Sequence, residues 1–237
     1  MILGVIGGLG PMATARFMEM VIQMTDASCD QEHLEMIIHN CPQIPDRTAY
    51  ILGESDRDPV PPMIRAGRAL ARQGVSCIAI PCITAHYFHR ELSEGIGIPI
   101  INAIAETGRE LTRNGARRIG LMATDGTIRS WIFQKELEKM GIEVVLPDEV
   151  YQKYIMDVIY NNIKSGQPVD MERFNAARQN LKEQGAEILI LGCTELSLVD
   201  REQLPGKGYL DAMEVLARSA VTSCRGHLKS KYENLIR

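Results

Sequence analysis

Short apolar runs alternate along the chain with longer stretches in which apolar residues recur at the spacing of an amphipathic helix. This alternation is typical of a parallel sheet whose strands are connected by covering helices. The predicted strands are residues 2–6, 36–38, 77–80, 98–101, 119–122, 143–146 and 188–191. Helices are expected to fill most of the gaps, so the pattern predicts the α/β fold class.

Glycine and proline positions refine this prediction at two places. Gly7, Gly8 and Gly10 end the first apolar run, and Pro11 stands where its fixed φ suits the first turn of a helix. Residues 43–62 contain a glycine and several prolines, which predicts a long excursion over the surface. Long loops of this kind often carry functional residues.

The sequence around residues 73–82 recurs around residues 184–193. In each copy a Gln-Gly pair leads into an apolar run, which is followed by one further residue and then by a cysteine, Cys82 or Cys193. The offset is 111 residues for the glycines (185 − 74) and for the cysteines (193 − 82). A weaker echo relates residues 4–14 to residues 120–124. We therefore interpret the chain as two similar halves.

The composition argues against several classes of partner. The 237 residues suffice for one α/β domain or for two compact domains that share a cleft. The 26 Lys and Arg residues are scattered among 30 Asp and Glu residues, and a net charge of -4 provides no basic field for a nucleic acid. No apolar stretch approaches the roughly 18–20 residues of a membrane span, and the first residues resemble a strand rather than a leader, so we expect a cytoplasmic protein without a membrane partner.

The six cysteines are expected to be reduced thiols, because the sequence shows no secretion signal. No metal is expected, since the only close group of ligands, Cys82, His86 and His89, lacks the usual spacing. A cysteine that follows a strand most often belongs to the core. That interpretation suits Cys29, Cys41, Cys77 and Cys224.

Cys82 and Cys193 indicate chemistry instead, because they share the offset and are accompanied by Thr84 and Thr194. In an open parallel sheet ligands bind beyond the carboxyl ends of the strands, where both cysteines fall. Racemising an amino acid requires a base and an acid on opposite faces of Cα. A thiol with a pKa of about 8.5 can serve either role near neutral pH, and a helix N-terminus would lower that pKa further. The two threonines can donate hydrogen bonds that meet the charge of the carbanion.

Five motifs in order then carry a family resemblance: GGLGPMAT (7–14), PQIPDRT (42–48), PCITAH (81–86), MATDGT (122–127) and GCTEL (192–196). The sequence resembles the aspartate/glutamate racemase family over most of its length. The resemblance implies an enzyme that racemises aspartate or glutamate with two cysteines and no cofactor. It further implies a homodimer of chains with two pseudo-symmetric α/β domains and an active site in the cleft between them. We expect residues 1–98 and 210–237 to form the first domain and residues 99–209 to form the second.

Carried over by position, the resemblance makes Arg47 a ligand for a substrate carboxylate and Lys164 a second cation toward the side-chain carboxylate. Glu195 either orients the substrate ammonium or caps the next helix. Ile83 stands where the family usually has Asn, so a polar contact with the substrate is lost. The resemblance therefore leaves open which amino acid is the substrate. The other positions expected to contact substrate are Met12, Thr48, Thr84, Ala85, Thr124 and Thr194.

Four alternatives stay open. The first is a racemase of other or broad specificity. The second is a cysteine hydrolase or lyase with Cys82 as nucleophile and His86 as base, although His86 could equally pack in the core. The third is a dinucleotide-binding domain, but the second predicted strand ends in His39-Asn40 instead of an acidic residue, and Pro11 interrupts the glycine turn. The fourth is a binding protein that has lost the chemistry.

Overall fold

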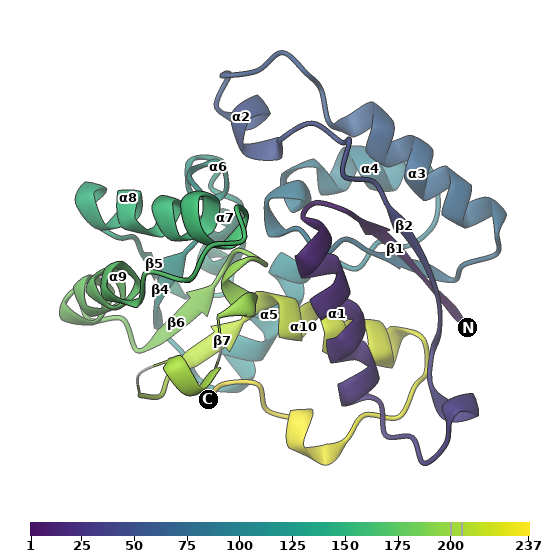
Figure 1. Ribbon diagram of the computed structural model, residues 1–237. Helices are drawn as coiled ribbons and strands as arrows, with labels where there is room; N and C mark the ends of the chain where they lie inside the picture. The colour runs from purple at the N-terminus through teal and green to yellow at the C-terminus, as the bar shows by residue number, and fades with distance from the viewer. Residues whose placement is uncertain (200, 205) are drawn as a thin grey trace.

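The computed structural model describes residues 1–199, 201–204 and 206–237, and its strands form two separate parallel sheets (Figure 1). The first sheet has the order β2-β1-β3, with β1 (Ile2–Gly7), β2 (Glu35–Asn40) and β3 (Cys77–Ala79). The second has the order β5-β4-β6-β7, with β4 (Arg118–Met122), β5 (Glu143–Val145), β6 (Ile188–Leu191) and β7 (Tyr209–Asp211). The predicted α/β class with two parallel sheets is confirmed.

One predicted strand is wrong and one strand was not predicted. Residues 98–101 form only an isolated bridge, in which Ile78 N–H donates to Pro99 O and Ile101 N–H donates to Ile78 O. Pro99 has no N–H to extend the ladder, and Asn102 caps a helix immediately afterwards, so the strand cannot grow. The strand missed was β7, which is ordered by its pairing with β6 and carries no distinct apolar run of its own.

The helices fill the gaps between strands. They are α1 (Pro11–Met24), α2 (Arg47–Ile51), α3 (Val60–Arg72), α4 (His89–Ile96), α5 (Ala103–Arg113), α6 (Asp125–Arg129), α7 (Ile132–Glu138), α8 (Glu149–Asp157), α9 (Met171–Glu183) and α10 (Ala212–Ser223). Short 3-10 segments include η2 (Ile83–Phe88) and η4 (Leu196–Leu198), and η3 (Val158–Ile163) is a π-helix. Pro11 occupies the first turn of α1, as predicted.

The segment predicted as one long loop, residues 43–62, is more ordered than expected. It contains α2, whose N-cap Asp46 accepts a hydrogen bond from Ala49 N–H. Its last prolines, Pro61 and Pro62, belong to the first turn of α3. Proline is tolerated there because N–H groups of the first turn have no partner within the helix.

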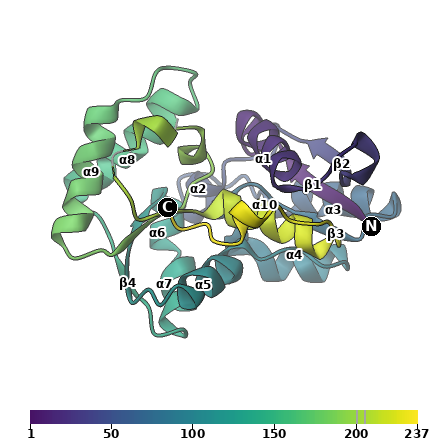
Figure 2. The same ribbon diagram turned by 90° about the horizontal axis from the view of Figure 1, so that it is seen from below.

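One cluster of buried apolar residues joins the two sheets. The largest cluster of buried residues contains Leu3 and Val5 of β1 together with Leu121 of β4 and Ile190 of β6. Helix α10 contributes to the same cluster and packs on α1 and α5, and Figure 2 shows it at the centre of the molecule. The predicted division into 1–98 with 210–237 and 99–209 stays a prediction. Strand β7 spans the predicted boundary and pairs with β6 of the second sheet.

The glycine turn after β1 lies directly against the end of β2. Gly8 has φ +89, and a Cβ there would lie 2.5–2.6 Å from backbone atoms of Cys41 and Pro42. Only glycine allows both this conformation and this approach. The contact fixes the start of the segment that carries Arg47.

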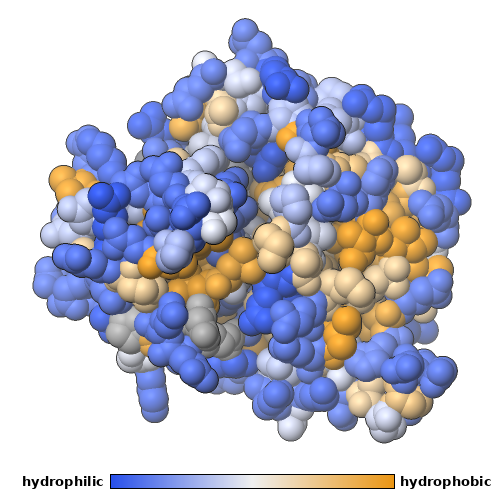
Figure 3. Space-filling model, viewed as in Figure 1, coloured by the Kyte–Doolittle hydropathy of each residue, from blue (hydrophilic) through white to orange (hydrophobic). Residues whose placement is uncertain are grey.

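The surface is mainly hydrophilic on the face shown in Figure 3, with apolar residues gathered over α1 and β2. Met18 and Ile22 of α1 are among the exposed apolar side chains. Within the described part of the chain, no helix is both long enough and apolar enough to cross a membrane.

Candidate active site

The two predicted cysteines line one cavity, at the carboxyl ends of strands from different sheets. Cys82 follows β3 and Cys193 follows β6, and both side chains are buried. The cavity has a volume of about 250 Å³. Its lining residues are Leu9, Asp46, Arg47, Thr48, Cys82, Ile83, Thr84, Thr124, Tyr160, Lys164, Cys193, Thr194 and Glu195.

The structure thus brings together ten of the twelve residues expected in the site. The other two lie elsewhere: Met12 is 69% exposed at the start of α1, and Ala85 is buried in a core cluster with Phe88. Sequence reasoning missed Leu9, Asp46 and Tyr160. Asp46 stands beside Arg47 in a quoted motif, whereas Tyr160 carries no sequence signal, because its position depends on the π-helix η3.

Arg47 is a buried cation held by the chain's own carbonyl groups. One terminal nitrogen donates to Ile44 O and Pro45 O, and the other donates to Leu9 O at 2.9 Å. Its Nε is buried without a hydrogen-bond partner. Burial lowers the pKa of Arg47, but interactions with Cys82 first, and then with Asp46, outweigh it and raise the pKa overall. The guanidinium therefore stays charged and faces Cys82.

Lys164 is the second cation of the cavity. Its Nζ lies 3.8 Å from Glu195 Oε1, 4.0 Å from Asp46 Oδ2 and 4.4 Å from the ring centre of Tyr160. Burial lowers the pKa of Lys164, but the Glu195 carboxylate above all raises it overall. Two carboxylates therefore share this ammonium group, and they follow strands of different sheets.

Cys193 and Glu195 form a direct pair. The thiol of Cys193 donates a hydrogen bond to Glu195 Oε2 at 2.9 Å. Burial raises the pKa of Cys193 well above its ordinary value, and the negative charge of Glu195 raises it further. The expectation of a pKa lowered by a helix N-terminus is wrong for Cys193, because burial and a neighbouring carboxylate dominate in the folded chain.

Threonine hydroxyls beside the cysteines connect segments that follow strands of different sheets. Thr84 Oγ1 lies 3.0 Å from both Thr124 Oγ1 and Thr127 Oγ1, and Thr48 Oγ1 lies 3.3 Å from Thr124 Oγ1. A Cβ on Gly126 would lie 2.9 Å from the Cα of Thr48, so a glycine is needed where α6 meets α2. Four hydroxyls are therefore concentrated at the edge of the cavity.

His86 is engaged by backbone groups. Its Nδ1 lies 3.0 Å from Cys82 O, and its Nε2 lies 3.3 Å from Ile101 O. Burial lowers the pKa of His86 from 6.5 to about 4, so the imidazole is neutral near pH 7. Both ring nitrogens face carbonyl oxygens, which is not the arrangement of a base that activates the Cys82 thiol.

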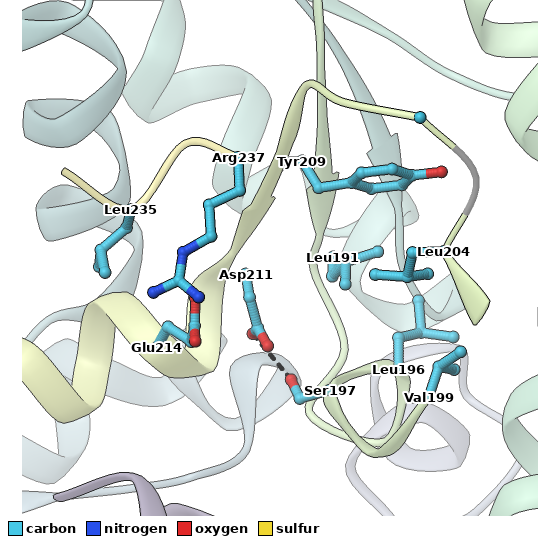
Figure 4. A pocket seen from close by; sticks show the side chains of 11 residues that line it. Leu191, Leu196, Ser197, Val199, Leu204, Tyr209, Asp211, Glu214, Leu235 and Arg237 are labelled. Atoms are coloured by element: carbon cyan, nitrogen blue, oxygen red, sulfur yellow. Dashed lines mark hydrogen bonds between the residues drawn. The ribbon is translucent and has the colours of Figure 1, made fainter. Parts of the chain in front are cut away.

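A second cavity, of about 650 Å³, lies next to the C-terminal segment. Figure 4 shows apolar side chains, including Leu191 and Leu196, on one side of it and polar side chains on the other, where Ser197 donates to Asp211 at 2.7 Å. None of the residues expected to contact substrate lines this cavity. The cavity between Cys82 and Cys193 is therefore the candidate active site.

Comparison with known proteins gives consistent matches over the whole chain. The family model described as Asp/Glu/Hydantoin racemase matches residues 6–220. A broad specificity amino-acid racemase from Bacillus subtilis is 32% identical over 232 residues, which cover 93% of this chain and 97% of that protein. All residues that line the cavity between Cys82 and Cys193 lie within residues 6–220, which the family model matches.

Solved structures resemble the chain in the same way. An aspartate racemase from Picrophilus torridus superposes with a TM-score of 0.84 at 29% identity, covering 99% of this chain and 98% of that one. A glutamate racemase from Francisella tularensis in complex with D-glutamate superposes with a TM-score of 0.69, covering 93% of this chain and 79% of that one. At 16% identity the second likeness shows the fold alone.

Proposed function

Because this chain belongs to the Asp/Glu/Hydantoin racemase family and is an amino-acid racemase, we propose that Cys82 and Cys193 are the two bases that exchange a proton at the Cα of an acidic amino acid. The observation that carries this proposal is that both thiols line one cavity although they follow strands of different sheets. Two acid–base groups from opposite sides of one cavity meet the stereochemical requirement of racemisation.

The reaction needs only protons to move. In one direction the Cys82 thiolate removes the Cα proton, and the Cys193 thiol delivers its own proton to the opposite face. The product leaves behind a Cys82 thiol and a Cys193 thiolate, and the reverse reaction uses the thiols in the opposite roles. Both transfers are assigned to protein side chains, so the proposal needs no cofactor.

Polar groups of the cavity can stabilise the negative charge that develops on the substrate. Threonine hydroxyls such as Thr84, Thr124 and Thr194 can donate to the α-carboxylate, and the unpartnered Nε of Arg47 supplies a fixed charged donor. Such preorganised donors commonly supply much of the rate enhancement in enzymes. The buried setting strengthens each of these interactions relative to water.

Arg47 and Lys164 support an acidic substrate, because a dicarboxylic amino acid carries two carboxylates to pair with two cations. A second candidate is a racemase of broad specificity. It is favoured by the sharing of Lys164 between Asp46 and Glu195, which already compensate its charge. Ile83, in place of an Asn, adds no polar contact for a particular side chain.

We expect the cavity to open for substrate entry, because hydroxyls that follow strands of different sheets contact one another at its edge. The contacts that must separate lie between α2 and α6 and between Lys164 and Asp46.

We also expect the protein to be a cytoplasmic homodimer, since closed symmetric dimers are the commonest assemblies. Light scattering after size exclusion would measure the mass of the assembly.

The first test is proton NMR in deuterium oxide with L-aspartate, L-glutamate and a panel of neutral and basic amino acids. Loss of the Cα signal, with the D form detected by chiral chromatography, identifies the substrate. We expect Cys82→Ala and Cys193→Ala each to abolish inversion. Full turnover in Cys193→Ala would support the hydrolase or lyase alternative. Binding without Cα exchange would support the binding-protein alternative.

A further inference from the structure

The two thiols of the site face opposite charges. The Cys193 thiol donates a hydrogen bond to Oε2 of the Glu195 carboxylate, and a carboxylate can only accept hydrogen bonds. Cys82 instead lies beside the guanidinium of Arg47, and the interaction between the two raises the pKa of Arg47. The two thiols therefore differ in proton affinity, and Cys193 holds a proton more strongly than Cys82.

The other charged and titratable groups of the cavity do not remove this difference. Lys164 lies 3.8 Å from Glu195 Oε1, and its charge lowers the pKa of Cys193, but burial and the Glu195 carboxylate outweigh this effect and raise that pKa overall. Tyr160 packs against Lys164 and stays protonated, because burial raises its pKa to about 12. Asp46 lies 4.0 Å from Lys164. Glu195 is thus the charged group that directly contacts Cys193.

We propose that Glu195 is a positioning residue that holds the mobile proton on Cys193 in the resting enzyme, so that the free protein carries a Cys82 thiolate and a Cys193 thiol. This inference rests on the proposed two-thiol mechanism. Each turnover that starts from the resting form moves the proton from the substrate to Cys82 and from Cys193 to the product. The enzyme returns to the resting form when Cys82 loses its proton to water and Cys193 regains one.

Unequal resting forms give the two enantiomers different kinetics. One enantiomer binds the abundant form, and the other must bind a minor form, which raises its apparent KM by the inverse of that form's population. Each unit of pKa difference between the thiols corresponds to about a tenfold difference in population. The equilibrium constant of racemisation is one, so kcat/KM is equal in both directions. The enantiomer with the lower KM therefore also has the lower kcat.

The test compares KM and kcat of both enantiomers, and the pH profile of kcat/KM, in the wild type, Glu195→Gln, Glu195→Asp and the surface control Glu149→Gln. Glu149 is matched in type, but it is exposed and pairs with Lys153 at 2.9 Å. We expect unequal KM values in the wild type and a ratio closer to one in Glu195→Gln. In Glu195→Gln, the pKa that defines the basic limb of kcat/KM should be lower by about one pH unit or more, because a like charge beside Cys193 is removed. Glu195→Asp, which keeps the charge, should lie between the two, and Glu149→Gln should match the wild type.

A site-specific measurement checks the same point without turnover. The rate of Cys193 alkylation by iodoacetamide, followed against pH by peptide mass spectrometry, should rise at lower pH in Glu195→Gln than in the wild type. Equal KM values for the two enantiomers of the wild type would overturn the inference, as would an unchanged ratio and basic limb in folded Glu195→Gln. If the wild type catalyses no Cα exchange, the proposed function itself fails. If Cα exchange requires both cysteines but the ratio of the two KM values does not depend on Glu195, only the present inference fails.

Discussion

The hydroxyl oxygens of Thr84 and Thr124 lie 3.0 Å apart, although the two residues follow strands of different sheets. This contact closes the cavity beside Cys82, and Thr48 and Thr127 extend it to four hydroxyls. Under the proposed function, these hydroxyls are the donors that we expect to bind a substrate carboxylate once the cavity opens.

Replacing Thr124 by Val keeps the shape of the side chain but removes the hydroxyl that contacts Thr48, Thr84 and Thr127. We expect kcat/KM to fall about tenfold or more, the effect of losing one or two hydrogen bonds to a charged substrate. Steady-state kinetics by chiral chromatography measures it. Thr222→Val on the exposed side of α10 is the control and should keep full activity. Unchanged kinetics in Thr124→Val would exclude the cluster from substrate recognition.

Arg47→Lys keeps the charge but cannot reproduce three hydrogen bonds to carbonyl oxygens. We expect KM to rise ten- to a hundredfold, because a charge-assisted hydrogen bond contributes about 1.5–3 kcal/mol. The melting temperature should fall as well, since buried carbonyls lose their donor. Arg57→Lys in the exposed part of the same segment is the control. A variant that loses stability but keeps its KM would make Arg47 a purely structural residue.

Cys77 and Cys224 provide a structural comparison for the two cysteines that we propose to be catalytic. Their Sγ atoms lie 3.6 Å apart in the core, and the cavity between Cys82 and Cys193 is lined by neither. We expect Cys77→Ala to cost about 1 kcal/mol of unfolding free energy, a usual value for a small buried deletion, and to leave kcat/KM within about twofold. Cys82→Ala and Cys193→Ala should show the opposite pattern. Urea titration and turnover assays on the same preparations compare them. Loss of turnover in a well-folded Cys77→Ala would contradict this assignment.

His86 predicts a pH dependence of stability. Its pKa is about 4 in the folded chain and 6.5 when unperturbed, so between these values the unfolded chain binds more protons than the folded one. Stability should be fully present above about pH 6.5 and fall toward pH 4, by on the order of 3 kcal/mol from this group.

Urea unfolding at a series of pH values measures this slope. His86→Gln removes the titration and should flatten the slope, while the exposed control His227→Gln should not change it. An equally steep slope in His86→Gln would assign the pH dependence to other groups.

Local sequence patterns predicted the framework of this molecule. Six of seven strands were placed because each is a short apolar run, and the parallel arrangement followed from the helical stretches between them. Both cysteines were singled out by the repeated offset of 111 residues (193 − 82). Residues 98–101 and β7 were misjudged because their pairing depends on neighbours and not on their own pattern.

The amino-acid sequence by itself determined the class of fold, the family and the two thiols, because these depend on local periodicity and on motifs of adjacent residues. Only the tertiary structure decided which charges each thiol faces. The π-helix that carries Tyr160 to Lys164, the pair of Lys164 with Asp46 and the burial of His86 all bring together groups that are distant in sequence or oriented by local backbone geometry. A pKa depends on burial and on charges within a few ångströms, and those distances exist only after the two sheets have packed on their common core.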